Sequence, residues 1–459
     1  MTEPARSRGH PGTPRRVATR AQRRGAARPA GPRPGEFRLA VGRAASVLQQ
    51  WLRRPLTSLH LVLGVFGLLT LFGLVMVLSA SAVEAYTAGG SSYSVFSRQL
   101  LFCMPGLAMF WAGLRIPPKT LRALAPALLL MGIVSLVAVL AVGDVRNGSR
   151  AWFELGSFSV QPAEAVKVAL TLWGAHVLAA RRAVLHRWKY ALSPVVPVAV
   201  VLFTLLVLQP DLGMTISLGV VLVALLFFAG APIRLLLAIT VGGLAGTVIL
   251  GLTAGYRASR ITSFLSPATA DPLAAGFQAR QALYSLADGG LFGVGLGQGR
   301  AKWSYLPNAH NDFIFAIIGE ELGFVGAFAV LGLFATLAYT GLRIAARNTD
   351  PWLKIVVATS TTWLVVQAAI NIGYVVGMLP VTGLQLPLIS SGGTSLVVTM
   401  FVFGLLANAA RHEPEAIAAL RGQRRGQQGR GAGRVARLLG LRPPQPYRAP
   451  AAQRTMVRR

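Results

Sequence analysis

The sequence predicts an all-α integral membrane protein with about ten transmembrane helices, and three observations support this fold class. Hydrophobic residues make up 53% of the 459 residues and the mean hydropathy is +0.56, whereas charged residues make up only 13%. The apolar residues gather in runs long enough to cross a hydrocarbon layer of about 30 Å. The basic residues, which give a net charge of +30, concentrate before Pro55, after Arg411 and in short turns between the runs. This composition excludes a soluble domain.

The segment before the first apolar run consists mostly of Arg, Pro, Gly and Ala, and we predict a disordered basic tail over residues 1–58. Its second part, residues 37–52, has apolar residues at helical spacing, which fits either a helix on the anionic inner leaflet or a plain juxtamembrane linker. The small residues Ser79–Ala82 resemble a signal-peptide cleavage site. Because the basic stretch is too long for a signal peptide and residues 60–78 can span a bilayer, we interpret them as an uncleaved first span.

Ten apolar runs lie near residues 60–80, 98–114, 121–142, 160–180, 191–209, 212–230, 233–254, 312–342, 353–379 and 388–409. Basic turns follow the even-numbered runs, so the positive-inside rule places these turns and both chain ends in the cytoplasm. We therefore predict a polytopic domain over residues 59–410, with a large outer loop between spans seven and eight, and a basic cytoplasmic tail over 411–459. The Arg-Gly segment 421–434 would suit RNA, but inner-leaflet lipid explains the same charge, so no nucleic-acid partner is predicted.

Acidic residues show the opposite distribution. Those at or near the predicted outer side are Glu84, Asp144, Glu154, Glu164, Asp211, Asp271, Asp288, Asp312, Glu320 and Glu321. Ionisable groups within or beside apolar runs are costly and usually mark a functional cavity, so we expect the chemistry to face outward. The single cysteine, Cys103, lies in an apolar run, which excludes an internal disulfide and a cysteine-based metal site.

The fourth span opens with Gln161 and carries Glu164 and Lys167 three residues apart, which places these two on one helix face. Two interpretations stay open. They form a structural ion pair that keeps two helices in register, or they line a polar cavity in which Arg150 and Lys167 attract an anion such as a pyrophosphate. Asp211, in the turn after the fifth span, most simply caps the next helix.

The outer loop, residues 255–309, is the longest connection between spans, and loops of that size inside a compact fold tend to be functional. It carries Arg260 and the glycine-rich run 289–299. No G-x-G-x-x-G register or strand–turn–helix context supports a dinucleotide site there. We instead expect these glycines to let the backbone bend at the membrane interface, near a bound head group.

Asp312 lies where this loop meets the eighth apolar run. Partial desolvation there suits its carboxylate to act as a general base toward a sugar hydroxyl, whereas the alternative is a helix N-terminal carboxylate favoured by the helix dipole. His310 has no spaced partner for a zinc site. By helical angle Glu320 lies nearer the face of Asp312 and supports the cavity, while Glu321 packs elsewhere.

The last outer turn, residues 379–394, is a broken apolar segment that includes Ser390 and Gly392. Irregular backbone at membrane depth is tolerated where it is buried in protein or lines a cavity, so we place this segment in the same pocket. A transporter gate would have the same appearance, and this segment alone does not distinguish catalysis from passage.

Five motifs together resemble the SEDS family (shape, elongation, division and sporulation). They are QPxExxK at 161–167, QPDxG at 209–213, LPxxHxDFIF at 306–315, EELG at 320–323 and PxxGxxLPxxSxGG at 380–393. The resemblance covers about residues 61–411, in order, and neither basic tail. The sequences of residues 307–311 and 383–387 resemble the division branch of the family more than the elongation branch. Long basic tails are typical of actinobacterial members.

The resemblance implies a peptidoglycan glycosyltransferase that polymerises lipid II at the outer face of the bacterial cytoplasmic membrane during division. Its implied partners are a class B penicillin-binding transpeptidase, other division proteins and membrane lipids. Asp312 would be catalytic and take the proton of the acceptor sugar's 4-hydroxyl as it attacks the donor's anomeric carbon with inversion. Arg150 and Lys167, with a divalent cation (Mg²⁺ or Mn²⁺) at an unknown site, would neutralise the polyprenyl pyrophosphate leaving group. The predicted substrate-binding set is Arg150, Gln161, Glu164, Lys167, Asp211, Arg260, His310, Glu320, Ser390 and Gly392.

Three positions depart from the family pattern, namely Ala163, Asn308 and Ser391, and the last two leave the loop chemistry open. Two other functions also stay open: a lipid II flippase without polymerase activity, and a scaffold for division proteins. The outward concentration of acids and the position of Asp312 near the surface, rather than at the midplane where transporter sites usually lie, favour catalysis.

Overall fold

The computed structural model describes residues 54–87, 90–146, 148–156, 158–185, 187–253, 275–303, 306 and 309–426, together with positions 46, 52 and 264. The chain divides into two compact units, residues 1–53 and 54–459, and the fold described below is that of the second. The predicted helix over 37–52 and the tail beyond Gly426 lie outside the described residues, apart from Ser46 and Leu52.

The predicted all-α membrane fold is confirmed. In the described part of the chain, nine helices are at least 18 residues long and apolar enough to cross a bilayer, and one further apolar helix has 14 residues. The ten are α2 (Thr57–Thr87), α3 (Ser94–Arg115), α4 (Pro118–Val142), α5 (Pro162–Ala180), α7 (Val195–Leu208), α8 (Leu212–Ala229), α9 (Ile233–Thr253), α12 (Ile314–Arg347), α13 (Pro351–Val375) and α14 (Gly393–Arg411). The short helix is α7, because the predicted run 191–209 is interrupted at Pro194, which has no N–H to donate, and its first residues belong to α6 (Trp188–Leu192).

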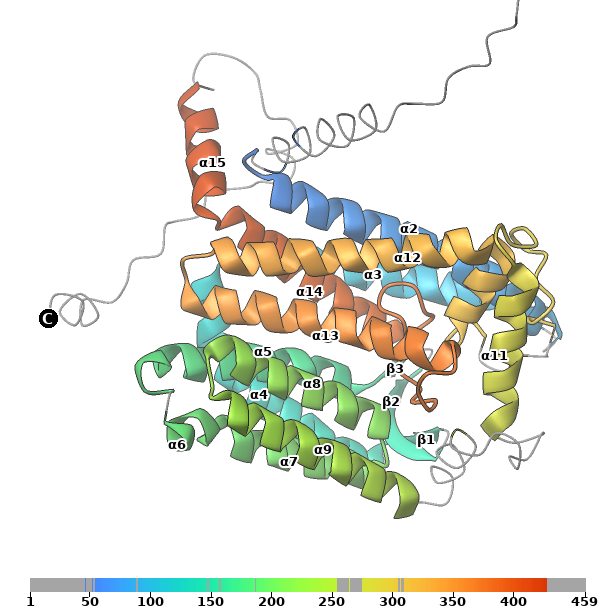
Figure 1. Cartoon of the computed structure of the whole chain (residues 1–459), viewed down its shortest axis with the longest axis horizontal. Helices are drawn as coiled ribbons and strands as arrows, with labels where there is room; N and C mark the ends of the chain where they lie inside the picture. Colours follow the sequence, from blue (N-terminus) through green and yellow to red (C-terminus); the bar gives the residue numbers. More distant parts are fainter. Residues whose placement is uncertain are drawn as a thin grey trace, which may run out of the picture. The chain divides into compact units, whose positions relative to one another are not determined.

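Consecutive long helices run in opposite directions, so the connections gather at two ends of the bundle (Figure 1). The basic end holds the arginine and lysine turns, the short helix η1 (Arg182–Val184) and α15 (Pro414–Gly426). The sheet end holds α11 (Ala275–Gly289) and a three-stranded antiparallel sheet of β1 (Asp144–Arg146), β2 (Ser149–Leu155) and β3 (Phe158–Val160). The sequence analysis does not predict this sheet. Which end faces the cytoplasm stays a prediction.

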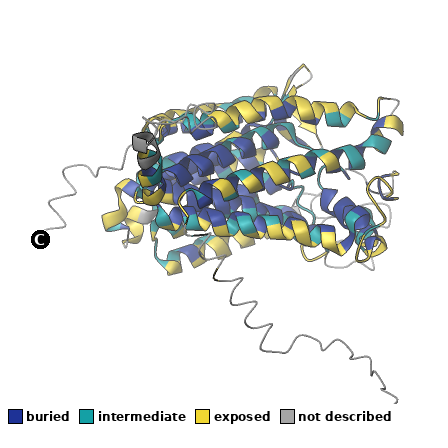
Figure 2. Cartoon of the chain, turned by 90° about the horizontal axis from the view of Figure 1, so that it is seen from above, coloured by how far each residue is buried: buried dark blue, intermediate teal, exposed yellow. Residues whose placement is uncertain are grey.

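The bundle is held together at its centre by α5, α13 and α14, whose residues are mostly buried, while the outward faces of the surrounding helices are exposed (Figure 2). Helices α3 and α14 pack backbone to backbone: a Cβ atom added to Gly404 would lie 2.2 Å from the carbonyl oxygen of Phe110. Asn408 of α14 donates to the carbonyl oxygens of Gly113 and Ile116, both at 2.8 Å, and Arg411 donates to that of Leu114 at 3.1 Å. Side chains of α14 thus satisfy the terminal carbonyl groups of α3.

Helix α12 is interrupted at Gly323, which has a left-handed φ of 65°. The glycine-rich run passes alongside the interruption and replaces the lost helical hydrogen bonds. The four bonds are Val294 N–H to Glu320 O (3.0 Å), Gly295 N–H to Glu321 O (3.0 Å), Phe324 N–H to Gly290 O (2.9 Å) and Val325 N–H to Leu291 O (3.1 Å). Gly290, Gly293, Gly295 and Gly297 have left-handed φ values, so the predicted bending of the backbone is confirmed, and the run also packs closely against the broken helix. The predicted head group nearby stays a prediction.

Candidate functional site

The predicted site residues that the structure describes lie at the sheet end of the bundle. Here α5, the turn before α12 and residues 379–392 meet one face of α13. At the start of α5, the Glu164 carboxylate and the Lys167 ammonium are 3.0 Å apart, and their side chains are only 2% and 1% exposed. Lys167 Nζ also lies 3.4 Å from Gln367 Oε1 and 4.5 Å from the ring centroid of Trp363. A buried lysine with an ion pair, an amide and a cation–π partner has the compensation that burial of its charge requires.

The geometry favours the structural interpretation of this pair over an open cavity wall. Arg150, which is predicted to line the same cavity as Lys167, is exposed on β2, whereas Lys167 is buried. The two cations separate because Lys167 points into the helix interface, whereas Arg150 belongs to a strand at the end of the bundle. The neighbouring ion pair on the sheet joins Arg146 and Glu154.

Gln161 and Asp211, both predicted to belong to the site, lie together and form a hydrogen bond with each other. Gln161 Nε2 donates to Asp211 Oδ2 at 2.9 Å, and Asp211 Oδ1 accepts the N–H of Met214 at 3.0 Å. Asp211 is therefore the N-cap of α8, which confirms the capping interpretation. The N–H of Gln161 donates to Thr394 Oγ1 at 3.1 Å, so these contacts tie together the first turns of α5, α8 and α14.

Asp312 is half-buried in the turn before α12. The helix begins at Ile314 with Phe313 as its N-cap residue, so Asp312 stands one position ahead of the cap. Its Oδ2 atom lies 3.8 Å from the position of a Cβ added to Gly383, which has a left-handed φ of 76°. The carboxylate is thereby placed beside the segment 379–392, which confirms that the two predicted parts of the site adjoin.

The backbone of the Asp312 turn is tied to α13. The carbonyl oxygen of Asp312 accepts from Asn371 Nδ2 at 3.0 Å and from the Tyr374 hydroxyl at 2.8 Å. The same two donors reach the carbonyl oxygen of Leu384, at 2.8 and 2.9 Å. Two buried side chains thus hold both the turn that carries Asp312 and the segment facing it.

His310 is held between two elements. Its Nδ1 atom lies 3.0 Å from the Glu84 carboxylate at the end of α2, and its carbonyl oxygen accepts the N–H of Ser391 at 3.0 Å. The side chain of Glu84 is 49% exposed and that of His310 is 19% exposed. His310 therefore remains accessible from the sheet end beside the Asp312 turn.

Glu320 and Glu321 both anchor the loop that precedes Asp312. The Glu320 carboxylate is buried and accepts backbone N–H groups of that loop, including Ala301 at 3.2 Å. Glu321 pairs with Lys302 at 2.9 Å, and the Ser79 hydroxyl donates to it. Glu320 thus supports the backbone of the loop that leads to Asp312, and a role for it in substrate binding stays a prediction. Glu321 contacts different partners, Lys302 and Ser79.

Ser390 and Gly392 shape the segment 379–392 from within. Ser390 is buried and its hydroxyl accepts the N–H of Leu386 at 2.8 Å. The N–H of Gly392 donates to Gln99 Oε1 at 3.3 Å, and a Cβ on Gly392 would fall 1.9 Å from Gln385 Oε1. These contacts give both residues a structural role in the turn.

Arg260 lies outside the described residues. Within the described ranges, no three side chains of His, Cys, Asp or Glu come together as metal ligands. No step below passes through a divalent cation. The predicted cation stays a prediction.

Several residues that hold the site are not among the predicted site residues, namely Lys302, Trp363, Gln367, Asn371 and Tyr374. Gln367 and Asn371 carry a usable signal, because amide side chains inside an apolar span usually line an interior contact. Lys302 carries none, since a lysine in a loop is most often solvated.

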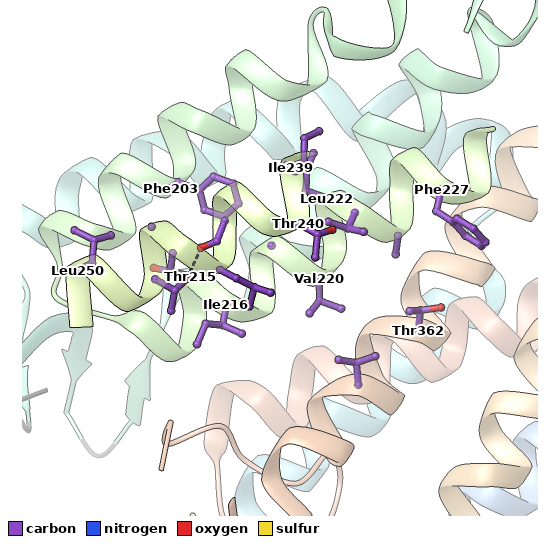
Figure 3. Close-up of a pocket in the computed structure, with 18 of the residues that line it drawn as sticks. Phe203, Thr215, Ile216, Val220, Leu222, Phe227, Ile239, Thr240, Leu250 and Thr362 are labelled. Atoms are coloured by element: carbon purple, nitrogen blue, oxygen red, sulfur yellow. Dashed lines mark hydrogen bonds between the residues drawn. The ribbon is translucent and has the colours of Figure 1, made fainter. Parts of the chain in front are cut away.

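An apolar cavity of about 560 Å³ lies between α7, α8, α9 and α13 (Figure 3). Phe203, Phe227, Leu250 and Thr362 are among its lining residues. It reaches Thr215, whose hydroxyl donates to the carbonyl oxygen of Asp211 at 2.7 Å. The cavity therefore extends from the polar contacts at the sheet end along the apolar interior of the bundle.

The fold and the site together define a polytopic membrane protein with a carboxylate beside an irregular backbone segment at one end of its bundle. The model of the FtsW/RodA/SpoVE family of cell cycle proteins matches residues 59–415, and the chain belongs to this family. The probable peptidoglycan glycosyltransferase FtsW of Mycobacterium tuberculosis is 52% identical over 402 residues, 87% of this chain and 75% of that protein. Stage V sporulation protein E of Bacillus subtilis is 41% identical over 360 residues, 78% of this chain and 98% of that protein.

Solved structures agree with this assignment. A chain in a peptidoglycan synthase complex that coordinates polymerization and crosslinking is 29% identical, with a TM-score of 0.63, and the match covers 79% of this chain and 98% of that chain. The rod shape determining protein RodA of Thermus thermophilus is 28% identical, with a TM-score of 0.58, and the match covers 80% of this chain and 99% of that chain.

Proposed function

We propose that this chain, a peptidoglycan glycosyltransferase of cell division, polymerises lipid II with Asp312 as the general base. The observation that carries the proposal is the placement of Asp312. Its carboxylate adjoins Gly383, and its backbone carbonyl is held by two buried side chains of α13. A general base needs a fixed position before its pKa matters, and this turn provides one.

The proposed reaction transfers the donor sugar to a hydroxyl of the acceptor sugar. The 4-hydroxyl oxygen of the acceptor sugar attacks the anomeric carbon of the donor, and Asp312 takes the hydroxyl proton. The bond between the anomeric carbon and the pyrophosphate oxygen breaks, so polyprenyl pyrophosphate leaves with the electron pair. The leaving pyrophosphate gains one negative charge beyond the two that it carries in the donor. Arg150, exposed at the sheet end, suits this anion better than Lys167, whose charge is already paired with Glu164.

The apolar cavity supports a lipid-linked substrate. A polyprenyl chain needs an apolar path that joins a polar site, and the cavity between α8, α9 and α13 reaches Thr215, one turn from Asp211. Helix α9 has the least buried span of the bundle, which leaves this side open to bilayer lipid. A head group at the sheet end and its chain in the cavity would then share one entry from the membrane.

We extend the proposal to partners and location. The similar chain in the synthase complex supports assembly with a class B penicillin-binding transpeptidase that crosslinks the new strands. The FtsW names of similar proteins support a place in the cytoplasmic membrane at the division septum, with the basic end in the cytoplasm.

The proposal is tested by purifying the chain with its class B partner and supplying labelled lipid II, with and without a divalent cation. Wild type should make glycan polymer, Asp312→Ala should make none, and Asp144→Asn, an exposed carboxylate change on β1, should retain wild-type activity. Lipid II transfer across proteoliposome membranes by a wild-type complex that makes no polymer would replace the transferase with a flippase.

A further inference from the structure

One face of α13 carries three polar side chains, Gln367, Asn371 and Tyr374, at positions i, i+4 and i+7. Each donates a hydrogen bond to a backbone carbonyl of the irregular parts of the site. Gln367 Nε2 reaches the carbonyl oxygen of Gln385 at 2.9 Å, and the other two reach those of Leu384 and Asp312. Polar groups are costly inside a span, so three of them on one face indicate a specific task.

Asn371 and Tyr374 share three hydrogens among the acceptors in front of them. The amide nitrogen of Asn371 carries two hydrogens and the Tyr374 hydroxyl carries one, and they face two carbonyl oxygens with two lone pairs each. Asn371 Nδ2 also lies 2.6 Å from the Tyr374 oxygen, which closes the cluster. Asn371 is fully buried and Tyr374 is 1% exposed, so neither carbonyl has water as a ready replacement donor.

The Tyr374 ring adds a second constraint on the same turn. It packs edge-to-face on Phe313, with ring centroids 5.7 Å apart, and Phe313 directly follows Asp312. The residue thus holds the turn through its ring and through its hydroxyl, and the two contributions can be separated by Tyr374→Phe, which keeps the ring. The other side of α13 faces the apolar cavity through Thr362 (Figure 3).

We propose that Asn371 and Tyr374 are positioning residues that set the place of the Asp312 carboxylate relative to the segment 379–392. This inference rests on the transferase function proposed above. Because both donors bind the carbonyls of Asp312 and Leu384 together, they fix the separation of the turn that carries the base from the backbone next to Gly383. They act through Asp312 and do not touch the substrate.

The same helix face extends this positioning to the ion pair on α5. Gln367 accepts from Lys167 at 3.4 Å and from Trp363 Nε1 at 2.9 Å, while its own amide hydrogens hold Gln385. Gln367 thereby links Lys167 to Gln385, which is the neighbour of Leu384 in the segment that Asn371 and Tyr374 hold. The positions of the two charged parts of the site depend on one helix face.

The test compares Tyr374→Phe, Asn371→Asp and the double variant with wild type in the complex with the class B partner. Thr359→Val is the matched control, because it removes a buried α13 hydroxyl that has no hydrogen-bond partner among the described residues. Tyr374→Phe should lower kcat by about tenfold at an unchanged KM, since small misplacements of a reacting group cost rate rather than binding. Asn371→Asp should lower kcat further, because it sets carboxylate oxygen against two carbonyls.

Two readouts separate positioning from general damage. In Tyr374→Phe, hydrogen exchange should accelerate in the peptides containing Asp312 and Leu384, while peptides from α4 and α14 stay as protected as in Thr359→Val. The double variant should lose less activity than the product of the single losses, since both residues hold the same carbonyls.

The outcomes are distinct. If wild type is active and Tyr374→Phe keeps its kcat, the positioning role is overturned and the transferase function stands. A raised KM at constant kcat in Tyr374→Phe would lead to the same conclusion. A folded wild-type complex that makes no glycan would overturn the transferase function, and with it a positioning role in this reaction.

Discussion

Replacement of Gly293 by alanine should detach the glycine-rich run from the interruption in α12. Gly293 has a φ of +79°, and an added Cβ would lie 2.2 Å from the carbonyl oxygen of Glu321. Gly297 provides a matched control in the same run, because its φ is +78° and its added Cβ meets nothing within 4 Å. Both substitutions carry the cost of a left-handed alanine, about 1–2 kcal/mol.

The steric overlap is present only at Gly293, and the two bonds closest to it are Val294 N–H to Glu320 O and Gly295 N–H to Glu321 O, both at 3.0 Å. Loss of both adds about 1–3 kcal/mol, because each net hydrogen bond contributes about 0.5–1.5 kcal/mol. Gly293→Ala should therefore destabilise this region by about 2–5 kcal/mol, against about 1–2 kcal/mol for Gly297→Ala.

Hydrogen exchange of the purified protein measures the difference. The peptides covering residues 289–300 and 322–327 should lose protection in Gly293→Ala much more than in Gly297→Ala, while α13 and α14 stay protected. Equal protection in the two variants would refute the view that backbone bonds from the run complete the broken helix.

Three further outcomes are expected. Lys167→Met should destabilise the fold by about 3–5 kcal/mol, because it leaves Glu164 buried and unpaired, and adding Glu164→Gln should recover stability. Unfolding in SDS measures both effects. A double variant that is stable but makes no glycan would give the pair a role beyond structure. Asp211→Ala should cost about 1 kcal/mol through the lost cap of α8, whereas Asp211→Asn should retain most of it; equal losses in the same assay would contradict the capping role. Burial and Arg411 lower the pKa of His412 below its ordinary 6.5, so the neutral ring is favoured in the fold. The stability that the neutral His412 ring contributes is fully present above pH 6.5 and is lost as the pH falls through the lowered pKa. Thermal unfolding of wild type should therefore shift downward between pH 7 and 5 more than that of His412→Gln, and identical pH slopes would contradict this.

Much of the architecture is predictable because the bilayer restricts the solutions. Hydropathy locates all ten apolar helices, and the charge of the turns alternates with them. The division of the run 191–209 at Pro194 follows from a residue whose effect inside a helix is known. The three-stranded sheet is harder to predict, since β1 and β3 have three residues each and carry no periodic signal.

The site is predictable in its charged members and not in their partners. Asp312, Glu164 and Lys167 stand out as ionisable groups beside or within apolar runs. The residues that hold them come from far along the chain: Gln367 is 200 positions from Lys167, and Tyr374 is 62 from Asp312. The roles of Glu320 and Glu321 depend on where the loop returns to α12, which helical angles alone do not specify.

The contact between α3 and α14 has a consequence for how the protein is made. Asn408 follows Gly113, whose carbonyl it satisfies, by 295 positions, so α3 enters the membrane long before its partner is synthesised. Until α14 arrives, the end of α3 lacks these donors, and Gly113, which packs against the backbone of α14, lacks a neighbour. Translation that stops short of residue 408 would leave an early span unfinished, and membrane quality-control proteases should remove such nascent chains rather than let a partial bundle accumulate.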